Sequence, residues 1–316
     1  MNNFDDGLEL STGKNPYLSA FLILFFSFIG ATVVGGGIGL LVGFLFFNGS
    51  MTEYMDIMNN MTSNKSFKIS AYVIQGVSAI IGFIVVPVLF MIIYEKKRIN
   101  QFFIKKTSAL LIALSAIIAI TFTGFNSWFV EWNANVHFPE IFSAFETYAR
   151  DMESRAMEMT KYLTEFESTG IFILAFIVIA VVPGIGEELV FRGFLQKYFH
   201  KAYNNIHIAI WASAIMFSAI HLQFFGFIPR MLLGALFGYL YYWSGNLIIP
   251  IVAHMANNGF MILMMYLYEL DYFETNVLDM ENLESVPFST FAVSGVVSFG
   301  LIYYFRKLNI ATNSVS

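Results

Sequence analysis

About eight long apolar stretches follow one another along this sequence, and each is close to the length that crosses a membrane as a helix. They cover residues 18–46, 69–94, 108–125, 170–195, 206–224, 227–243, 247–267 and 288–305. A spanning helix needs about 20 mainly apolar residues and satisfies its own backbone polar groups where water is absent. Only 12% of the residues are charged, against about 25% in soluble domains. The sequence therefore predicts an all-α protein, a polytopic transmembrane helical bundle of about eight spans.

Basic residues gather in three places between or after these stretches and predict the orientation. They are Lys96, Lys97, Arg98, Lys105 and Lys106 after the second stretch, Lys197 and Lys201 after the fourth, and Arg306 and Lys307 after the last. Cytoplasmic connections of membrane proteins carry an excess of Lys and Arg. With eight spans, all three groups lie on one side if both termini are cytoplasmic. We predict this orientation for an integral membrane protein.

The segment 126–168 is then extracytoplasmic and has a pattern of its own. Apolar residues recur at helical spacing among charged ones, at Ile141, Phe145, Tyr148, Met152, Met159, Tyr162 and Phe166. This pattern predicts an amphipathic helical segment that lies on the outer membrane interface. A soluble helical hairpin between two spans is the alternative.

Three glycines in the first stretch are spaced four residues apart, at Gly35, Gly39 and Gly43. Small residues at this spacing let two membrane helices approach closely. We expect a packing face here, with a hinge as the alternative.

Nearly all ionisable or strongly polar side chains within the apolar stretches fall into three clusters. They are Glu187, Glu188 and Arg192; Ser218 and His221; and His254, Asn257 and Asn258. Charged groups at membrane depth are costly and usually functional. The chain has no cysteine, which excludes disulfides, thiol nucleophiles and Cys-ligated metals.

Helix geometry gives the two adjacent carboxylates different roles. Glu188 and Arg192 are four residues apart, so they share a helix face and can form an ion pair. Glu187 points about 100° away from its neighbour and is left free to act as a base. A pair that only locks the helix is the alternative for Glu188 and Arg192.

The three clusters lie at similar depths if each residue adds about 1.5 Å along its helix, so Glu187, His221 and His254 can meet near mid-membrane. A Glu and a His can hold and deprotonate a water, while a His with Asn258 can stabilise an oxyanion. This chemistry predicts a hydrolase without a covalent nucleophile. Glu187, His221 and His254 are also an acceptable zinc ligand set, although the His-Glu-x-x-His signature is absent. Each His can alternatively be a hydrogen-bonded packing residue.

The ordered motifs resemble those of the CPBP family, the CAAX-processing and bacteriocin-processing (Abi, type II CAAX prenyl protease-like) intramembrane endopeptidases. The family pattern Glu-Glu-x-x-x-Arg, Phe-x-x-x-His and His-x-x-x-Asn is found here as Glu187-Glu188…Arg192, Phe217…His221 and His254…Asn258, within about 170–267. The resemblance implies that Glu187 activates water and that His221 helps to hold it. It also implies an oxyanion site of His254 and Asn258, with Glu188 and Arg192 as structural support. A compact chain of eight spans favours a bacterial member, in the inner (plasma) membrane.

These inferences divide the chain into three parts: N-terminal helices with the outer segment (1–168), a CPBP-like catalytic core (169–268), and a C-terminal helix with its tail (269–316). The expected partners are a peptide or protein substrate in the membrane and the lipid bilayer. Nucleic acid is not expected, because no basic patch is available for phosphates. No cofactor is expected, and zinc is the alternative.

The leading function is a glutamate-dependent intramembrane endopeptidase. A non-catalytic membrane immunity or scaffold protein of the same family is the first alternative. A proton-coupled transporter is the second, since buried Glu and His also form proton relays. Such a transporter would be expected to have inverted repeats, and the sequence contains none that we can detect.

Overall fold

The computed structural model describes residues 13–103, 105–272 and 287–313, and every regular element in these ranges is a helix. Six helices in this part of the chain are long and apolar enough to cross a membrane: Pro16–Phe44, Lys65–Tyr94, Ala109–Ala134, Thr169–Tyr203, Ile248–Glu269 and Phe288–Ile310. The predicted polytopic helical bundle is confirmed.

The fifth predicted span is shorter in the structure than the apolar pattern suggested, whereas the sixth agrees to within one residue. Helix α11 (Ile206–Ala219) has 14 residues and ends five residues before the predicted limit at 224. The chain turns there, and Leu222 adopts a left-handed backbone with φ of 56°. Helix α12 (Phe227–Ser244) has 18 residues. Apolar composition alone could not reveal this turn, because residues 220–226 are nearly as apolar as the helices beside them.

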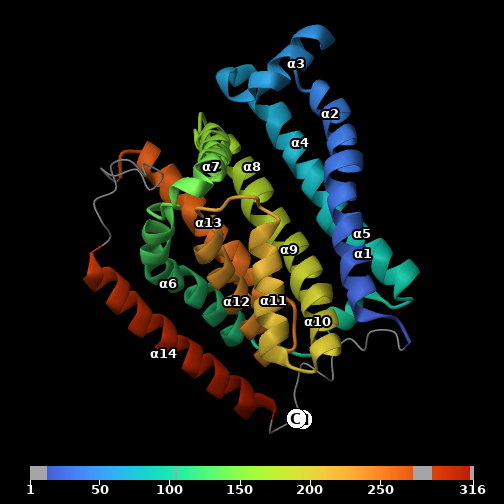
Figure 1. Cartoon of the computed structure of the whole chain (residues 1–316), viewed down its shortest axis with the longest axis vertical. Helices are drawn as coiled ribbons and strands as arrows, with labels where there is room; N and C mark the ends of the chain where they lie inside the picture. The colour runs from blue at the N-terminus through green and yellow to red at the C-terminus, as the bar shows by residue number, and fades with distance from the viewer. Residues whose placement is uncertain (1–12, 104, 273–286, 314–316) are drawn as a thin grey trace.

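The N-terminal helices form one side of the molecule (Figure 1). Helix α1 (Pro16–Ile29) continues through a π-helical stretch, Gly30–Gly35, into α2 (Gly36–Phe44). After the short α3 (Met51–Ile57) the chain returns as α4 (Lys68–Ile80), a second π-helical stretch and α5 (Val86–Leu89). A capping box between Ser50 and Glu53 begins α3, which satisfies two backbone donors at the reversal.

The predicted glycine packing face lies in the contact between α1–α2 and α4. A Cβ atom at Gly35 would lie 2.8 Å from Cα of Ser78, and one at Gly39 would lie 3.0 Å from Cα of Ile74. At Gly43 the nearest atom would be the Tyr54 hydroxyl, at 2.7 Å. The two backbones approach so closely that no larger residue fits without displacement.

Helix α6 (Ala109–Ala134) ends nine residues beyond the predicted limit of the third span at 125. Asn126 and Asn133 are buried, because their side chains bind the backbone near the start of α12. Asn126 Nδ2 donates to the Pro229 carbonyl at 3.1 Å, and Asn133 Oδ1 accepts from the Ile228 amide at 2.9 Å. Residues 126–134 therefore continue the helix, and the extracytoplasmic position of the segment 126–168 stays a prediction.

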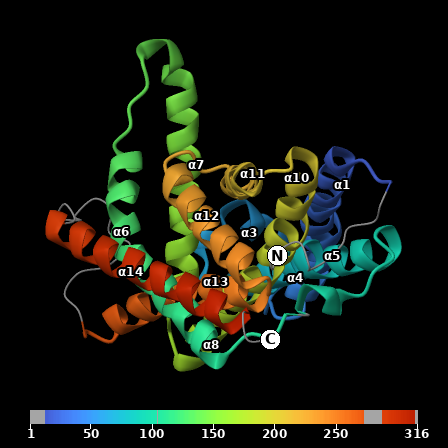
Figure 2. The same cartoon turned by 90° about the horizontal axis from the view of Figure 1, so that it is seen from below.

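The predicted amphipathic helix is α7 (Ser143–Thr164), which reaches well beyond the rest of the bundle (Figure 2). Ile141, Phe142, Phe145 and Tyr148 are exposed near its start, and Tyr162 and Leu163 are buried near its end. Only its C-terminal end is therefore anchored deeply in the bundle. Its place on the outer membrane surface stays a prediction.

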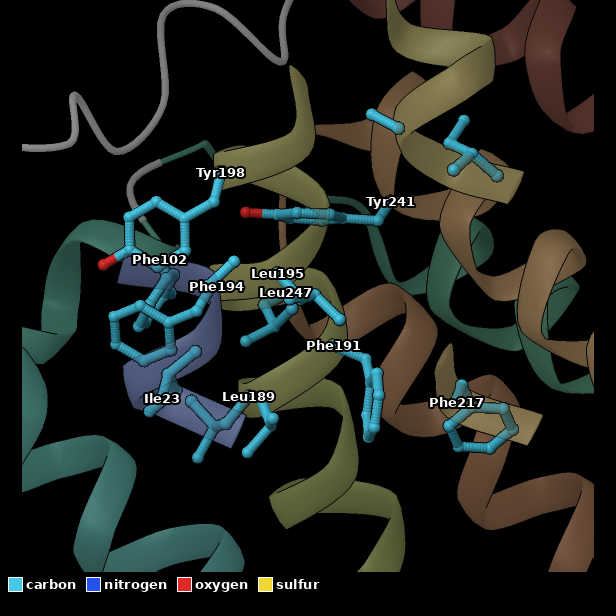
Figure 3. Packing of buried hydrophobic residues seen from close by; sticks show 14 of the residues in the cluster. Ile23, Phe102, Leu189, Phe191, Phe194, Leu195, Tyr198, Phe217, Tyr241 and Leu247 are labelled. Atoms are coloured by element: carbon cyan, nitrogen blue, oxygen red, sulfur yellow. The ribbon is translucent and has the colours of Figure 1, made fainter. Parts of the chain in front are cut away.

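The central helix of the molecule is continuous from Thr169 to Tyr203. It consists of α8 (Thr169–Ala175), α9 (Val182–Glu188) and α10 (Gln196–Tyr203), joined by π-helical stretches at Phe176–Val181 and Leu189–Leu195. Figure 3 shows its buried face, where Phe191 and Phe194 pack among residues of α1 and α11. Helix α13 (Ile248–Glu269) packs beside it, and α14 (Phe288–Asn313) lies outside against α6.

Candidate active site

Glu188 is the most buried of the candidate site residues and binds two partners. Its Oε1 accepts from Nη1 of Arg192 at 2.7 Å and lies 2.8 Å from Nδ1 of His254. Arg192 also donates from Nη2 to the Gly234 carbonyl in α12 at 2.7 Å. Both charged side chains are almost completely inaccessible to solvent, at 0% and 1%. The predicted ion pair is present, and it connects three helices.

His254 lies between the two carboxylates. A carboxylate paired with Arg is ionised and can only accept hydrogen bonds, so Nδ1 of His254 carries the proton that Glu188 accepts. The other ring nitrogen, Nε2, lies 3.9 Å from Oε2 of Glu187. This distance is too long for a direct hydrogen bond. A ligand atom or a water can interact with both groups.

Glu187 is 15% exposed, whereas Glu188 is fully enclosed. Two residues that are adjacent in sequence thus occupy different environments, as the helical geometry predicted. In the described part of the chain no side chain lies within hydrogen-bonding distance of the Glu187 carboxylate. Glu187 is therefore the carboxylate available to a substrate.

Two aromatic rings enclose the buried groups. Phe237 stacks on His254 with ring centres 5.1 Å apart, and Phe217 meets the same imidazole edge-on at 5.9 Å. The Arg192 guanidinium lies 4.8 Å from the Phe217 ring centre. These contacts exclude water from Glu188 and fix the plane of the His254 ring.

His221 lies just beyond the end of α11, where its ring packs 5.3 Å from the Phe217 ring. Its Nδ1 is 2.8 Å from the Phe217 carbonyl oxygen. A carbonyl only accepts, so Nδ1 carries the proton and Nε2 of a neutral ring is left as an acceptor. The Phe-x-x-x-His spacing thus places Phe217 against both histidines.

Asn258 has protein partners on both sides of its amide. Its Nδ2 donates to the Ile179 carbonyl at 3.2 Å, and its Oδ1 accepts from Asn257 Nδ2 at 3.1 Å. Asn257 in turn accepts from the Thr123 hydroxyl of α6 at 3.3 Å. The resemblance to the CPBP family implies an oxyanion site of His254 and Asn258. The structure leaves one Nδ2 hydrogen of Asn258 unused for a ligand.

The alternative zinc site has no support from the geometry of its donors. In the ranges that the structure describes, no three His, Asp or Glu side chains are grouped so that they could hold a metal ion. The set Glu187, His221 and His254 does not fit a zinc ligand arrangement, and no step is assigned to a metal. That no cofactor is needed stays a prediction.

Sequence analysis did not single out Arg230, which lies in the second turn of α12. Its Nη2 donates to Gln223, two residues after His221, and it lies one helical turn before Gly234, which binds Arg192. The sequence feature that could have indicated this residue is a lone arginine in the apolar stretch 227–243. Charged residues within such stretches are usually functional.

An apolar groove of about 410 Å³ lies on another face of α13, between Phe172 and Phe176 on one side and Met255 and Phe260 on the other. None of the candidate site residues lines it. The polar site and this groove are therefore separate features of α13.

Fold and site together define a helical membrane protein with a carboxylate–histidine centre inside the bundle. Residues 169–260 match the family described as type II CAAX prenyl endopeptidase, Rce1-like. This range includes all six candidate site residues, and the match confirms the resemblance to the CPBP family. The family supports a protease-type enzyme.

One curated relative is the uncharacterized protein YpbD of Bacillus subtilis, which is 32% identical over 82 residues. The matching part is 25% of this chain and 39% of YpbD, so the chain matches about two fifths of that protein's length. No solved structure matches significantly.

Proposed function

We propose that this protein is an intramembrane endopeptidase that hydrolyses a peptide bond of a membrane-associated protein or peptide. The observation that carries the proposal is the division of labour between the two adjacent carboxylates. Glu188 is occupied by Arg192 and His254, whereas Glu187 is partly exposed and faces the second nitrogen of the same imidazole. The family match over 169–260 supports the reaction class.

In the proposed mechanism Glu187 removes a proton from water as the oxygen attacks the scissile carbonyl. Nε2 of His221 accepts a hydrogen bond from this water, since its Nδ1 is bound to the Phe217 carbonyl. Glu187 then returns the proton to the leaving amine. Positioned acid–base groups of this kind contribute about 10²–10⁴ in rate.

His254 and Asn258 are proposed to stabilise the oxyanion. For His254 to donate from Nε2 its ring must carry both protons, with Nδ1 donating to Glu188. With His254 charged, two carboxylates balance Arg192 and the imidazolium. Asn258 offers its remaining Nδ2 hydrogen, held in place through Asn257.

The test is the Glu187→Gln variant, compared with wild type for proteins that accumulate uncleaved in the membrane. We expect cleavage to fall by at least about 100-fold, because the amide cannot take the proton. The Glu158→Gln variant, at an exposed carboxylate of α7, is the matched control and should cleave normally. Full cleavage by folded Glu187→Gln would contradict the mechanism.

A non-catalytic immunity or scaffold role is the second candidate, favoured by the exposed apolar start of α7. Ile141 is 85% exposed and Tyr148 is 62% exposed, so this helix could contact another membrane component. In this case the immunity that the protein confers on its cell would survive Glu187→Gln. It would be lost when Ile141 and Tyr148 are both replaced by Ser.

A further inference from the structure

The Arg230 guanidinium has a hydrogen-bond partner at one of its two terminal nitrogens. Its Nη2 donates to Oε1 of Gln223 at 2.8 Å. Its Nη1 is buried and has no hydrogen-bond partner in the described structure. A Cβ atom at Gly226 would lie 3.0 Å from Nη2, so the glycine lets the guanidinium rest directly on the preceding turn.

Gln223 connects Arg230 to α7. Its Nε2 donates to Oε1 of Glu153 at 3.2 Å, so an amide separates the carboxylate from the guanidinium. Arg150 of α7 contacts the same turn, with its guanidinium 4.2 Å from the Phe225 ring centre. Arg230 is therefore fixed in place by α7, the turn 220–226 and α12.

A purely structural ion pair does not explain this arrangement. Among the described residues, no carboxylate lies within 4.0 Å of the Arg230 guanidinium, because Gln223 lies between it and Glu153. Buried charges are normally paired and hydrogen-bonded. Arg230 keeps a charge and a donor nitrogen that the protein itself does not use.

The position of this unused donor relates it to the reaction. Arg230 is bound by Gln223, two residues after His221, and lies one helical turn before Gly234, whose carbonyl accepts from Arg192 of the site. A cation with a free N–H thus lies where the turn after His221 meets α12, the helix that also binds Arg192 of the site. A guanidinium binds carboxylates more strongly than neutral carbonyls, because the hydrogen bond is charge-assisted.

We propose that Arg230 is a substrate-binding residue whose Nη1 binds a carboxylate of the substrate close to the scissile bond. This carboxylate is either the C-terminal one or that of an acidic side chain. The inference rests on the proposed endopeptidase function and adds that the preferred substrates are anionic at this position.

The test uses full-length protein in phosphatidylglycerol–phosphatidylethanolamine vesicles. The substrate probe is a synthetic peptide with the cleavage-site sequence of a protein that accumulates uncleaved in Glu187→Gln cells. A second peptide carries a C-terminal carboxamide, and a third has its acidic side chains replaced by amides. For wild type, we expect KM to rise at least about tenfold for one of the two neutralised peptides, which identifies the carboxylate.

The Arg230→Gln variant should raise KM for the unmodified peptide to the same extent, with kcat changed by less than about threefold. Neutralising the identified carboxylate should then have no further effect in this variant. Arg230→Lys, which keeps the charge, should recover part of the affinity. Arg155→Gln, at an exposed arginine of α7, should leave both constants unchanged.

Equal KM values of wild type for all three peptides would overturn the proposal, and this comparison does not depend on the folding of any variant. An equal loss of kcat for all peptides in Arg230→Gln would assign the residue a structural role. If wild type and Glu187→Gln cleave alike, it is the proposed function itself that fails.

Discussion

At the scale of residues, two adjacent glutamates supply a buried ion pair and an accessible carboxylate. Glu188 and Arg192 are enclosed by Phe217 and Phe237, while Glu187 retains contact with the outside. Both residue types are expensive to bury. Their difference in exposure is what gives adjacent glutamates different chemistry.

Loss of Arg192 should destabilise the fold strongly, because Glu188 would keep its charge in an enclosed position. We expect Arg192→Met to lower the free energy of unfolding by about 3–5 kcal/mol, measured by denaturant unfolding in mixed micelles. Arg155→Met removes an exposed pair with Asp151 and should cost less than about 1 kcal/mol. Equal losses for the two variants would contradict a stabilising role for the buried pair.

At the scale of elements, α7 has local polar contacts at its start and is joined to the bundle at its end. At its start, Glu146 accepts from the Phe138 amide at 2.8 Å and from Nη2 of Arg150 at 2.7 Å. Its last residues are buried, and Tyr162 donates to the Asn64 carbonyl at 2.7 Å. The charged first turn explains why the helix begins soon after Pro139, although Ile141 and Phe142 beside it are exposed.

The start of α7 should respond to acid. The Phe138 amide, with the Arg150 and His137 side chains, lowers the pKa of Glu146 from 4.5 to about 2. A lowered pKa means that the contribution to stability is complete above pH 4.5 and is lost as the pH falls through about 2. We expect Glu146→Gln to speed hydrogen exchange of residues 138–147 at neutral pH, with a difference from wild type that shrinks below pH 4.5. A constant difference down to pH 2 would contradict this, and Glu158→Gln serves as control.

At the scale of the whole molecule, α3 and α7 lie at one end, and α10 and the C-terminal end of α14 lie at the other (Figure 1). The latter end carries the basic residues of α10 and α14, as expected if these residues share one side of the membrane. That this side is cytoplasmic stays a prediction.

The absence of cysteine makes the orientation directly testable. Single-cysteine variants at Lys96, Tyr148 and Arg306 place a thiol at exposed sites. In intact cells a membrane-impermeant maleimide should label only Tyr148→Cys, and the other two should react after the membranes are opened. The opposite labelling pattern would show that the predicted orientation is inverted. Labelling of the Lys96 and Arg306 positions from different sides would contradict the predicted number of spans.

Sequence alone determined the features that depend on helical spacing. The apolar stretches gave the spanning helices, the four-residue interval gave the Glu188–Arg192 pair, and the glycine series gave the close contact of α1–α2 with α4. The end of α11, the length of α6 and Arg230 were missed. These depend on a turn, on buried asparagines and on a guanidinium whose neighbours come from other elements.

Only the tertiary structure decided which groups from different helices meet. The contact of His254 with Glu188 joins residues 66 positions apart, and the rings that enclose it come from α11 and α12. Residues four apart on a helix face the same way whatever surrounds them, because the backbone fixes the angle between them. The rotation of one helix against another is set by packing along its whole length, so motif spacing could predict that the clusters meet but not which atoms bind.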